Sequence, residues 1–311
     1  HRPQNISTLR TFQKTRCDKE YQAHTAKVHS IGWSCDGKRL ASGSFDKTVT
    51  IFTLDRDRLV SAKFTFKGHG GSVDQLCWHA KNPELLCTAS GDKTVRVWDT
   101  RTQKCPATVH TKGENMYITW APDGNTIAVG NKEDLVTFID ARMYKIRAEQ
   151  QFAFEVNEIS WNNDSNLFFL TNGQGSHPVT CICIEFDPLG RYFATGSADA
   201  VVSLWDVHEL ACIRTFYRLD WPVRALSFSH DGNLLAFASE DLVIDIAEVE
   251  TGIKVADVVV EAATFTIAWH PSQYLLAYAC DDKVAYDRKK DSGNLKVFGF
   301  QNDKLFNVFN P

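Results

Sequence analysis

A repeat of about 40 residues runs through most of this chain, and self-similarity at this period is typical of folds in which small similar units stack on one another. In each copy an aromatic residue closes a short run of alternating apolar and polar residues, and a turn follows at once. Seven such aromatic anchors occur in the 311 residues, namely Trp33, Trp78, Trp120, Trp161, Phe186, Phe228 and Trp269. Successive anchors lie 45, 42, 41, 25, 42 and 41 positions apart.

The residues after the anchors predict strands joined by tight turns. Asp-Gly pairs follow three anchors, at residues 36–37, 123–124 and 231–232, and this pair supplies the positive φ that a tight hairpin needs. Strand-like runs come next, such as Tyr192–Thr195 and then Val201–Trp205. Helical periodicity is hard to find anywhere in the chain. Seven units of four strands predict an all-β fold, a seven-bladed β-propeller.

Closure of such a ring requires that its last blade be complete, because an incomplete blade leaves an open strand edge. The C-terminal run Leu295–Phe298 reads as the third strand of that blade. We predict that the N-terminal run Thr11–Cys17 supplies the fourth strand, so that the ring is closed by the N-terminal strand. Residues 1–10 are then a tail, and residues 11–311 form the propeller.

The spacing between Trp161 and Phe186 is much shorter than the others and departs from the period. The fourth blade ends near Gly175, and the next unit begins at once with His177. Compared with the other spacings, about 17 residues are missing, which corresponds to the third and fourth strands of the blade. We therefore predict a blade four truncated after Gly175, with a gap in the chain at that point.

A polar set recurs in three units at fixed spacing. A histidine lies nine residues before the anchor, an aspartate follows it by 22 or 23 residues, a hydroxyl lies four residues before that aspartate, and an aromatic lies six after it. The set comprises His24, Ser42, Asp46, His69, Thr88, Asp92, Trp98, His177, Thr195, Asp199 and Trp205, with Phe52 as the aromatic of the first unit. These residue types match a hydrolase triad. A catalytic set occurs once per site, however, so the repetition favours a buried structural network.

Composition excludes several classes of function. A net charge of −4 is not the basic balance of a dedicated nucleic-acid binder. The nine cysteines form no CxxC pair, and no metal site or cofactor site is predicted. No apolar run approaches the length of a membrane helix. The charged segment 281–293 lacks His, Cys and a Gly-rich phosphate loop, so we predict no catalytic residues and no small-molecule substrate.

The segment Ser90–Asp99 fits the WD40 repeat signature at almost every position, so the predicted ring is a seven-bladed WD40 β-propeller. Longer segments resemble the family of subunit 3, the WD40 subunit of the THO complex, and the similarity runs from about Phe12 to Phe300. They are residues 68–79, 154–164, 195–206, 219–226 and 244–252. The resemblance implies a nuclear, non-enzymatic scaffold that is held by the large helical subunit of that complex. It also implies a place in the transcription–export assembly, which couples transcription to mRNA packaging and export.

Loops of a propeller present the residues that meet partners. Several residues on the inter-blade loops and on the turns between second and third strands have no obvious core role. They are Phe45, Glu114, Asn115, Met116, Phe154, Asn157, Asp220 and Trp221. Exposed aromatics of this kind often mark protein partner sites, although Phe154 and Trp221 could instead plug blade interfaces. The chain lacks the aromatic–basic strand pattern of RNA-recognition motifs, so any RNA contact is indirect or peripheral.

An alternative function depends on Trp98-Asp99-Thr100-Arg101, which fits the WDxR pattern of substrate receptors of cullin–RING ubiquitin ligases. This pattern also occurs by chance in many WD40 repeats. Co-purification with the ligase adaptor, as opposed to helical THO subunits, distinguishes the two hypotheses.

Overall fold

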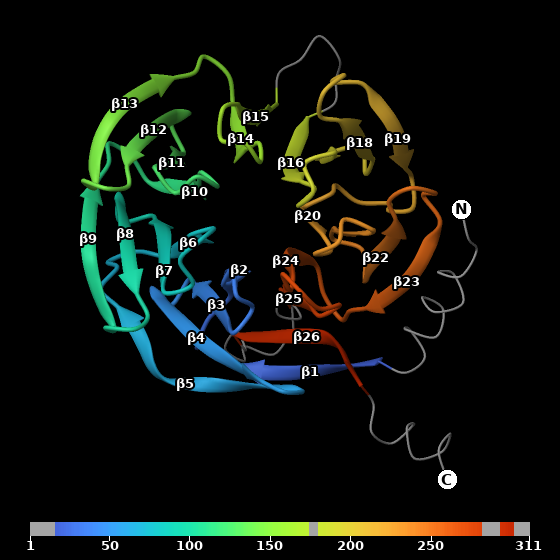
Figure 1. The fold of residues 1–311 in the computed structure, drawn as a ribbon, viewed down its shortest axis with the longest axis horizontal. Coiled ribbons are helices and arrows are strands. Elements are labelled where there is room, and N and C mark those ends of the chain that lie inside the picture. The colour runs from blue at the N-terminus through green and yellow to red at the C-terminus, as the bar shows by residue number, and fades with distance from the viewer. Residues whose placement is uncertain (1–15, 174–179, 282–292, 302–311) are drawn as a thin grey trace, which may run out of the picture.

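The computed structural model describes residues 16–173, 180–281 and 293–301, which form a ring of β-sheets (Figure 1). These ranges contain 26 strands and no helix. Each sheet is an antiparallel meander in which the first strand lies innermost. The short alternating runs of the sequence account for this, because the inner strands are buried between neighbouring blades while outer strands such as residues 145–151 are mostly exposed.

The first three blades each have four strands. Blade one consists of β2 (Val28–Trp33), β3 (Arg39–Ser44), β4 (Thr48–Asp55) and β5 (Arg58–Lys67). Blade two consists of β6 (Val73–Trp78), β7 (Leu85–Ser90), β8 (Thr94–Asp99) and β9 (Lys104–His110). Blade three consists of β10 (Asn115–Trp120), β11 (Thr126–Asn131), β12 (Leu135–Asp140) and β13 (Lys145–Gln151).

The sheet at the fourth position has only two strands, and the sheets after it are again complete. The fourth sheet consists of β14 (Val156–Trp161) and β15 (Phe168–Asn172). Blade five consists of β16 (Cys181–Phe186), β17 (Tyr192–Ser197), β18 (Val202–Asp206) and β19 (Cys212–Phe216). Blade six consists of β20 (Ala225–Phe228), β21 (Leu234–Ala238), β22 (Val243–Glu248) and β23 (Lys254–Val259).

The last blade combines the two ends of the described chain. It consists of β24 (Thr264–Trp269), β25 (Leu276–Cys280), β26 (Asn294–Gln301) and β1 (Arg16–Gln22). Strands β1 and β26 pair antiparallel, with Tyr21 opposite Leu295. The predicted strand Thr11–Cys17 overlaps β1 only at Arg16 and Cys17, while residues 1–15 lie outside the described residues. The hydroxyl of Tyr21 accepts a hydrogen bond from the N–H of Leu59 at 3.0 Å and so ties β1 to blade one.

The prediction of a seven-bladed ring with a truncated fourth blade is therefore corrected to six four-stranded blades and one two-stranded sheet. Too few residues separate β15 from β16 to form two further strands. The predicted end of blade four at Gly175 and the start of the next unit at His177 lie outside the described residues. The innermost strand β14 nevertheless packs against β10 on one side and β16 on the other, so the inner layer continues past the short sheet.

The core lies in layers between adjacent blades. Between blades one and two, for example, Ala41, Val49 and Ile51 pack against Val73 and Trp78, and all five residues are buried. Each innermost strand is an edge strand, so some of its backbone N–H groups have no partner within their own sheet.

Side chains of the preceding blade accept hydrogen bonds from these N–H groups at five joints of the ring. At the joint between blades six and seven, Ser227 Oγ accepts from the N–H of Trp269 at 3.0 Å. At the other four joints, the third residue of one innermost strand accepts from the fourth residue of the next. The bonds run from Ile31 to Thr266 Oγ1 (3.2 Å), Leu76 to Ser30 Oγ (3.2 Å), Ile118 to Gln75 Oε1 (2.5 Å) and Ile184 to Glu158 Oε2 (2.7 Å). These bonds explain why polar residues occupy the third position of the innermost strands, where they join one blade to the next.

Candidate protein-interaction site

The meander gives the ring two faces that carry different loops. Connections between blades and turns between second and third strands lie on one face, which we call the inter-blade face. Turns after first and third strands lie on the opposite face, which we call the turn face. All eight residues that the sequence predicts to bind partners belong to segments of the inter-blade face or to the innermost strands that start there.

The polar network of blade two fixes one inter-blade loop to the outer part of its sheet. Trp98 Nε1 donates to Thr88 Oγ1 at 2.9 Å, Thr88 Oγ1 lies 2.7 Å from His69 Nε2, and His69 Nδ1 lies 2.9 Å from Asp92 Oδ2. One tautomer satisfies this chain, in which Nδ1–H donates to Asp92 and Nε2 accepts from the Thr88 hydroxyl. The His69 side chain is only 1% exposed. Its two ring nitrogens contact Asp92, Thr88 and Thr94.

The charges of this network follow from burial and hydrogen bonding. Burial lowers the pKa of His69, although Asp92 opposes the shift, so the imidazole is neutral at pH 7. Burial alone would raise the pKa of Asp92. Hydrogen bonds from Thr94, His69 and the backbone N–H of Gly70 outweigh that effect and lower the pKa of Asp92 to about 2.

Blade one repeats the arrangement without the indole. His24 Nδ1 lies 3.0 Å from Asp46 Oδ2, and its Nε2 lies 2.8 Å from Ser42 Oγ. Burial opposes ionisation of Asp46, but bonds with His24, Thr48 and the Thr25 backbone hold its pKa well below the usual range. Phe52 has no N–H to offer, so the network of blade one lacks its last link.

Blade five repeats part of the predicted pattern. Trp205 Nε1 donates to Thr195 Oγ1 at 2.9 Å, as in blade two. Asp199 accepts hydrogen bonds from Ser197 Oγ and from the N–H of Val201. The predicted partner of Asp199 is His177, which lies outside the described residues.

Blade six contains an ion pair between an inter-blade loop and a strand. The sequence pattern missed this pair because it uses arginine instead of histidine. Arg218 donates through Nε and Nη2 to both oxygens of Asp245, at 2.7 and 2.8 Å. Asp245 is 1% exposed, and the guanidinium lies over the rings of Phe216 and Phe237. The pair connects the inter-blade loop to the third strand, whereas His69 and Asp92 connect the loop of blade two to the turn before its third strand. Its signal in the sequence is an arginine before the anchor and an aspartate inside an otherwise apolar strand.

Two of the predicted partner residues are prominently exposed aromatics. Phe45 is 62% exposed and lies at the tip of the turn between β3 and β4. Trp221 is 55% exposed in the loop between β19 and β20. The backbone N–H groups of Asp220 and Trp221 both donate to Asp241 Oδ2, at 3.0 and 3.1 Å, so this loop has a fixed conformation.

Two other predicted partner residues make contacts inside the fold. Asn115 is only 1% exposed and donates from Nδ2 to the carbonyl of Thr94 and to Thr111 Oγ1. Phe154 is half-buried against the core beside β14, and its ring lies 5.2 Å from that of Phe152. The sequence pattern could not separate these from exposed residues because short loops also contribute to the core.

The remaining predicted residues lie at or near the centre of the ring. Met116 and Asn157 line a cavity of about 440 Å³ on the inter-blade side, which also includes Glu155 and Arg224. Asn157 Nδ2 donates to the carbonyl of Cys181 at 2.8 Å, so it also joins the fourth and fifth sheets. Glu114 forms an ion pair with Lys132 beside this region. The inter-blade face therefore combines a central hollow with an exposed aromatic rim.

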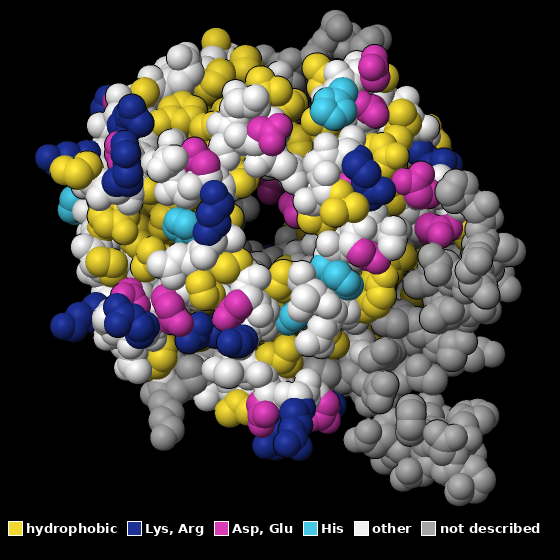
Figure 2. All heavy atoms as spheres, in the orientation of Figure 1, with side chains coloured by type: hydrophobic (Ala, Val, Ile, Leu, Met, Phe, Trp, Pro, Cys, Tyr) yellow, Lys and Arg dark blue, Asp and Glu magenta, His cyan; other side chains and the backbone are white. Residues whose placement is uncertain are grey.

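A second cavity of about 440 Å³ shares several residues with the first, including Glu158, and adds Glu185. Figure 2 shows the hollow in the centre of the ring, with acidic side chains on its wall. Burial raises the pKa of Glu158 to about 7, against the effect of hydrogen bonds from the Ile184 N–H and Gln75. Burial and the neighbouring Glu158 raise the pKa of Glu185 to about 8. The sequence analysis did not single out either glutamate.

The WDxR motif has a structural explanation in this fold. Asp99 Oδ1 accepts hydrogen bonds from the N–H groups of Arg101 and Thr102 at the start of a turn. Asp140 makes the same bonds to Arg142 and Met143 in blade three. The Asp-x-Arg spacing thus marks a recurring turn, which makes it weak evidence for a ligase adaptor.

The described ranges contain no group of three or more His, Cys, Asp or Glu side chains arranged to hold a metal ion. In the same part of the chain, no helix is long and apolar enough to span a membrane.

Comparison with known proteins identifies the family. Residues 24–279 match the family described as THOC3 beta-propeller domain. THO complex subunit 3 of Arabidopsis thaliana is 46% identical over 306 residues, covering 93% of this chain and 97% of the relative. WD repeat-containing protein AAC3 of Dictyostelium discoideum is 29% identical over 328 residues, covering 91% of this chain and 66% of that protein.

A solved structure supports the fold alone. The β-propeller domain of Cps50 (Swd1) from Myceliophteria thermophila superposes with a TM-score of 0.77 at 15% identity, covering 91% of this chain and 99% of that domain. The family match includes most of the described ring, and the Arabidopsis relative is matched over nearly its full length. The chain therefore belongs to the THOC3 β-propeller family.

Proposed function

We propose that this chain is the β-propeller subunit of a nuclear THO complex, where it serves as a scaffold that binds other proteins. In that role it helps to couple transcription to mRNA packaging and export. The observation that carries the proposal is the 46% identity to a THO complex subunit 3, which extends over 97% of that relative. RNA reaches the complex through other subunits in this proposal, since the chain has a net charge of −4.

The chain acts without catalysis in this proposal. The only constellation with the residue types of a hydrolase is the His, hydroxyl and Asp set, and its best-formed copy within the described ranges is buried in blade two. A catalytic histidine must contact substrate, whereas the inward-facing His69 contacts only protein groups. The network contributes rigidity to the loops that surround the central hollow.

The binding surface in this proposal is the exposed rim of the inter-blade face. Trp221 lies in the same region as Tyr217, which is 71% exposed, and Leu242, which is 59% exposed. Because Asp241 holds the Asp220–Trp221 backbone, little conformational entropy is lost when a partner binds there. Such pre-ordered aromatic residues suit the apolar stripe of a helix, so we assign the large helical subunit of the complex to this rim.

Co-purification tests the surface directly. The double variant Phe45→Ala, Trp221→Ala should reduce recovery of the other THO subunits from nuclear extract by at least about tenfold, since aromatic hot spots contribute about 2 kcal/mol or more. Its melting temperature should match that of the parent chain, because both side chains are mostly exposed.

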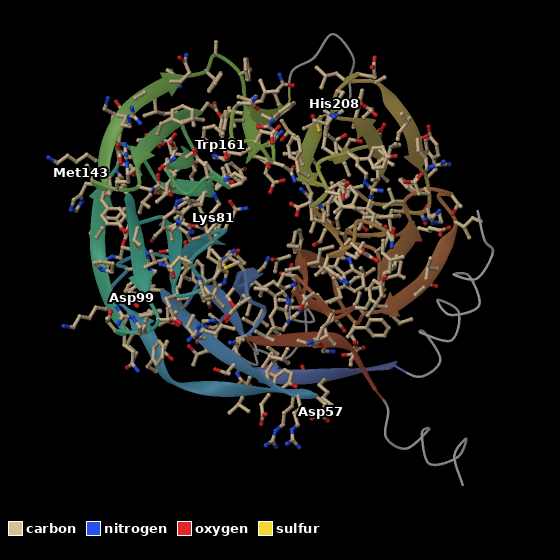
Figure 3. The ribbon with its side chains drawn as sticks, in the orientation of Figure 1. Asp57, Lys81, Asp99, Met143, Trp161 and His208 are labelled. Atoms are coloured by element: carbon tan, nitrogen blue, oxygen red, sulfur yellow. The ribbon has the colours of Figure 1, made fainter. Side chains whose placement is uncertain are left out.

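A matched control uses exposed apolar residues of the turn face. Met143 and Leu189 are 64% and 58% exposed, and Figure 3 shows Met143 at the outer rim of the ring. The variant Met143→Ala, Leu189→Ala should recover the subunits normally. If the control loses them and the Phe45, Trp221 variant retains them, the partner uses the turn face. If the parent chain recovers no THO subunit at all, the proposed function itself is wrong.

A further inference from the structure

Arg96, the third residue of β8, is a half-buried arginine without an oxygen acceptor in the described ranges. Its Nε is buried and has no hydrogen-bond partner there. Its Nη1 makes only a long contact with Cys105 Sγ at 4.0 Å, and its guanidinium carbon lies 5.8 Å from the centre of the Trp98 ring. Because a guanidinium carries five N–H donors in a planar fork, most of its hydrogen-bonding capacity is unused within this chain.

The other half-buried arginines of the described ranges all donate to an oxygen atom. The pairs are Arg39 with Glu84, Arg191 with Asp187, Arg224 with Glu240, and Arg214 with the carbonyl of Glu250. A charge that is partly removed from water without such an acceptor costs free energy of folding. The guanidinium of Arg96 is therefore not explained by its contacts within this chain.

The equivalent joint of blade six shows how this position can be filled. Asp245 is the third residue of β22 and occupies the place that Arg96 has in β8. Its partner Arg218 lies two residues after the buried phenylalanine that precedes the loop into blade six, and Gly68 lies at the same distance in the loop into blade two. In blade six the loop supplies the arginine and the strand supplies the carboxylate. In blade two the strand supplies the arginine, and the loop residue has no side chain, so the carboxylate of this pair is missing.

Gly68 brings the guanidinium of Arg96 close to the surface. A Cβ atom placed on Gly68 would lie 2.8 Å from Arg96 Nη1 and 3.3 Å from the Trp98 ring. Gly68 is itself exposed, so only the backbone of this residue separates the guanidinium from the outside of the ring. A group supplied by another molecule can therefore approach Arg96 at this joint without displacing a side chain of Gly68.

The surroundings of this joint are basic. Lys67 precedes Gly68, and it lies beside the turn that contains Lys47, because Thr48 is opposite Lys67 in the sheet. Lys47, Lys67 and Lys93 are exposed, and none of them forms an ion pair in the described ranges. The acidic residues of the same turns, Asp46 and Asp92, are 13% exposed and are bound to His24 and His69. The accessible charge around Arg96 is therefore positive, although the chain as a whole has a net charge of −4.

We infer that Arg96 binds a carboxylate of a partner protein, an aspartate or glutamate in a short acidic segment that lies across the joint between blades one and two. The carboxylate accepts hydrogen bonds from the guanidinium, as Asp245 does from Arg218, and the exposed lysines attract the acidic residues beside it. A carboxylate is favoured over the phosphates of a nucleic acid because the equivalent pair of blade six is built with a carboxylate. This site goes beyond the proposed function, since it lies at a different joint from Trp221 and selects a charge instead of an apolar stripe.

Thermal unfolding of two variants is the first test. Arg96→Met keeps an aliphatic side chain over Trp98 and removes the unpaired guanidinium, so it should melt no more than about 2 °C below the parent chain. Arg218→Met leaves the buried Asp245 without its partner and should melt at least about 5 °C below the parent. If Arg96→Met lowers the melting temperature as much as Arg218→Met does, the guanidinium stabilises the chain by itself and the inference is wrong.

Binding of a fluorescein-labelled hexaglutamate peptide to the full chain is the second test, with fluorescence anisotropy at low ionic strength as the measurement. Arg96→Met should weaken the affinity at least about tenfold, because it removes a charge-assisted hydrogen-bond donor. Arg96→Lys should bind more tightly than Arg96→Met and more weakly than the parent, since it keeps the charge and loses the planar fork. Arg101→Met is the control and should bind like the parent, because Arg101 is an exposed arginine on the turn face of the same blade.

Three results of the binding test would overturn the inference. They are a parent chain that does not bind the peptide, a parent chain that binds a labelled decauridine RNA and not the peptide, and an Arg96→Met variant that binds the peptide like the parent. Because this test uses the chain alone, its failure is distinct from a failure to recover THO subunits by co-purification.

Discussion

Asp92 and Asp199 occupy the same place in the repeat, yet they differ in their surroundings. Asp92 is 13% exposed and receives His69, whereas Asp199 is exposed and bonds to its near neighbours Ser197 and Val201. The energetic value of a repeated residue therefore depends on how deeply the surrounding chain buries it.

The variant Asp92→Ala should lower the free energy of unfolding by about 1–3 kcal/mol, because it leaves a buried imidazole N–H without an acceptor. Asp199→Ala should cost less than about 0.5 kcal/mol, as is usual for an exposed position. Urea unfolding of both variants measures the difference. Equal losses in the free energy of unfolding would show that the two aspartates stabilise the fold to the same extent.

Glu185 gives a prediction of pH dependence. Its pKa is raised to about 8 in the folded state, whereas the usual value for glutamate is near 4.5. The unfolded chain then binds fewer protons than the folded chain between these two values, so this group destabilises the fold as pH rises through that window. Glu185→Gln removes the effect, and it should make the protein more stable than the parent at pH 8 by about 1–3 kcal/mol.

At pH 4.5 and below, the Glu185→Gln variant and the parent should unfold at nearly the same urea concentration. Glu155→Gln is the control, because Glu155 is exposed. A constant difference between Glu185→Gln and the parent at pH 5 and pH 8 would contradict the raised pKa of this half-buried carboxyl group.

At the scale of single elements, inter-blade loops are held to third strands in more than one way. Blade two uses His69 with Asp92, and blade six uses Arg218 with Asp245. Arginine suits the second case because its planar fork meets both carboxylate oxygens while its flat face covers Phe216 and Phe237.

Arg218→Lys should therefore be a damaging substitution although it retains the charge. It should cost about 1–3 kcal/mol, because Asp245 is buried and loses its second hydrogen bond. Arg142→Lys is a matched control, since the Arg142 side chain is 72% exposed and lies 3.7 Å from Asp140. A denaturation midpoint for Arg218→Lys within error of the Arg142→Lys midpoint would show that the Arg218–Asp245 ion pair does not stabilise the fold.

The sequence predicted the repeating strands well because anchors such as Trp78 and turns such as Asp36-Gly37 are local signals. It also predicted the partners of His69, since they recur at constant spacing. It could not predict Arg218 with Asp245, which occurs once and uses other residue types. Nor could it show that Asn115 is buried, because exposure of a loop residue depends on the neighbouring blade. The part of the predicted closing strand that precedes Arg16 lies outside the described residues.

At the scale of the whole molecule, the ring depends on pairing between residues from opposite ends of the chain. Strand β1 covers the edge of β26, and Asn294 donates to Glu20 Oε1 at 2.8 Å across this joint. An edge that lies next to blade one cannot be left open without loss of packing on both sides.

Deletion of residues 1–22 should therefore lower the melting temperature by at least about 5 °C and should make β26 sensitive to proteolysis. Limited proteolysis followed by mass spectrometry would locate the first cuts. A synthetic peptide of residues 16–22, supplied in excess, should restore part of the lost stability. If the shortened chain melts like the parent and resists cleavage, β1 is dispensable for the ring.

The bonds between innermost strands have a direction, and this has a consequence for synthesis on the ribosome. Ser30 accepts from Leu76, and Gln75 accepts from Ile118, so each finished blade presents an acceptor to the blade that follows it. A growing chain can thus add blades in order as they emerge. The bond from Ile31 to Thr266 is the exception, because its acceptor is made last and its donor first. The first blade must therefore wait with one backbone donor unoccupied until almost the entire chain has been made.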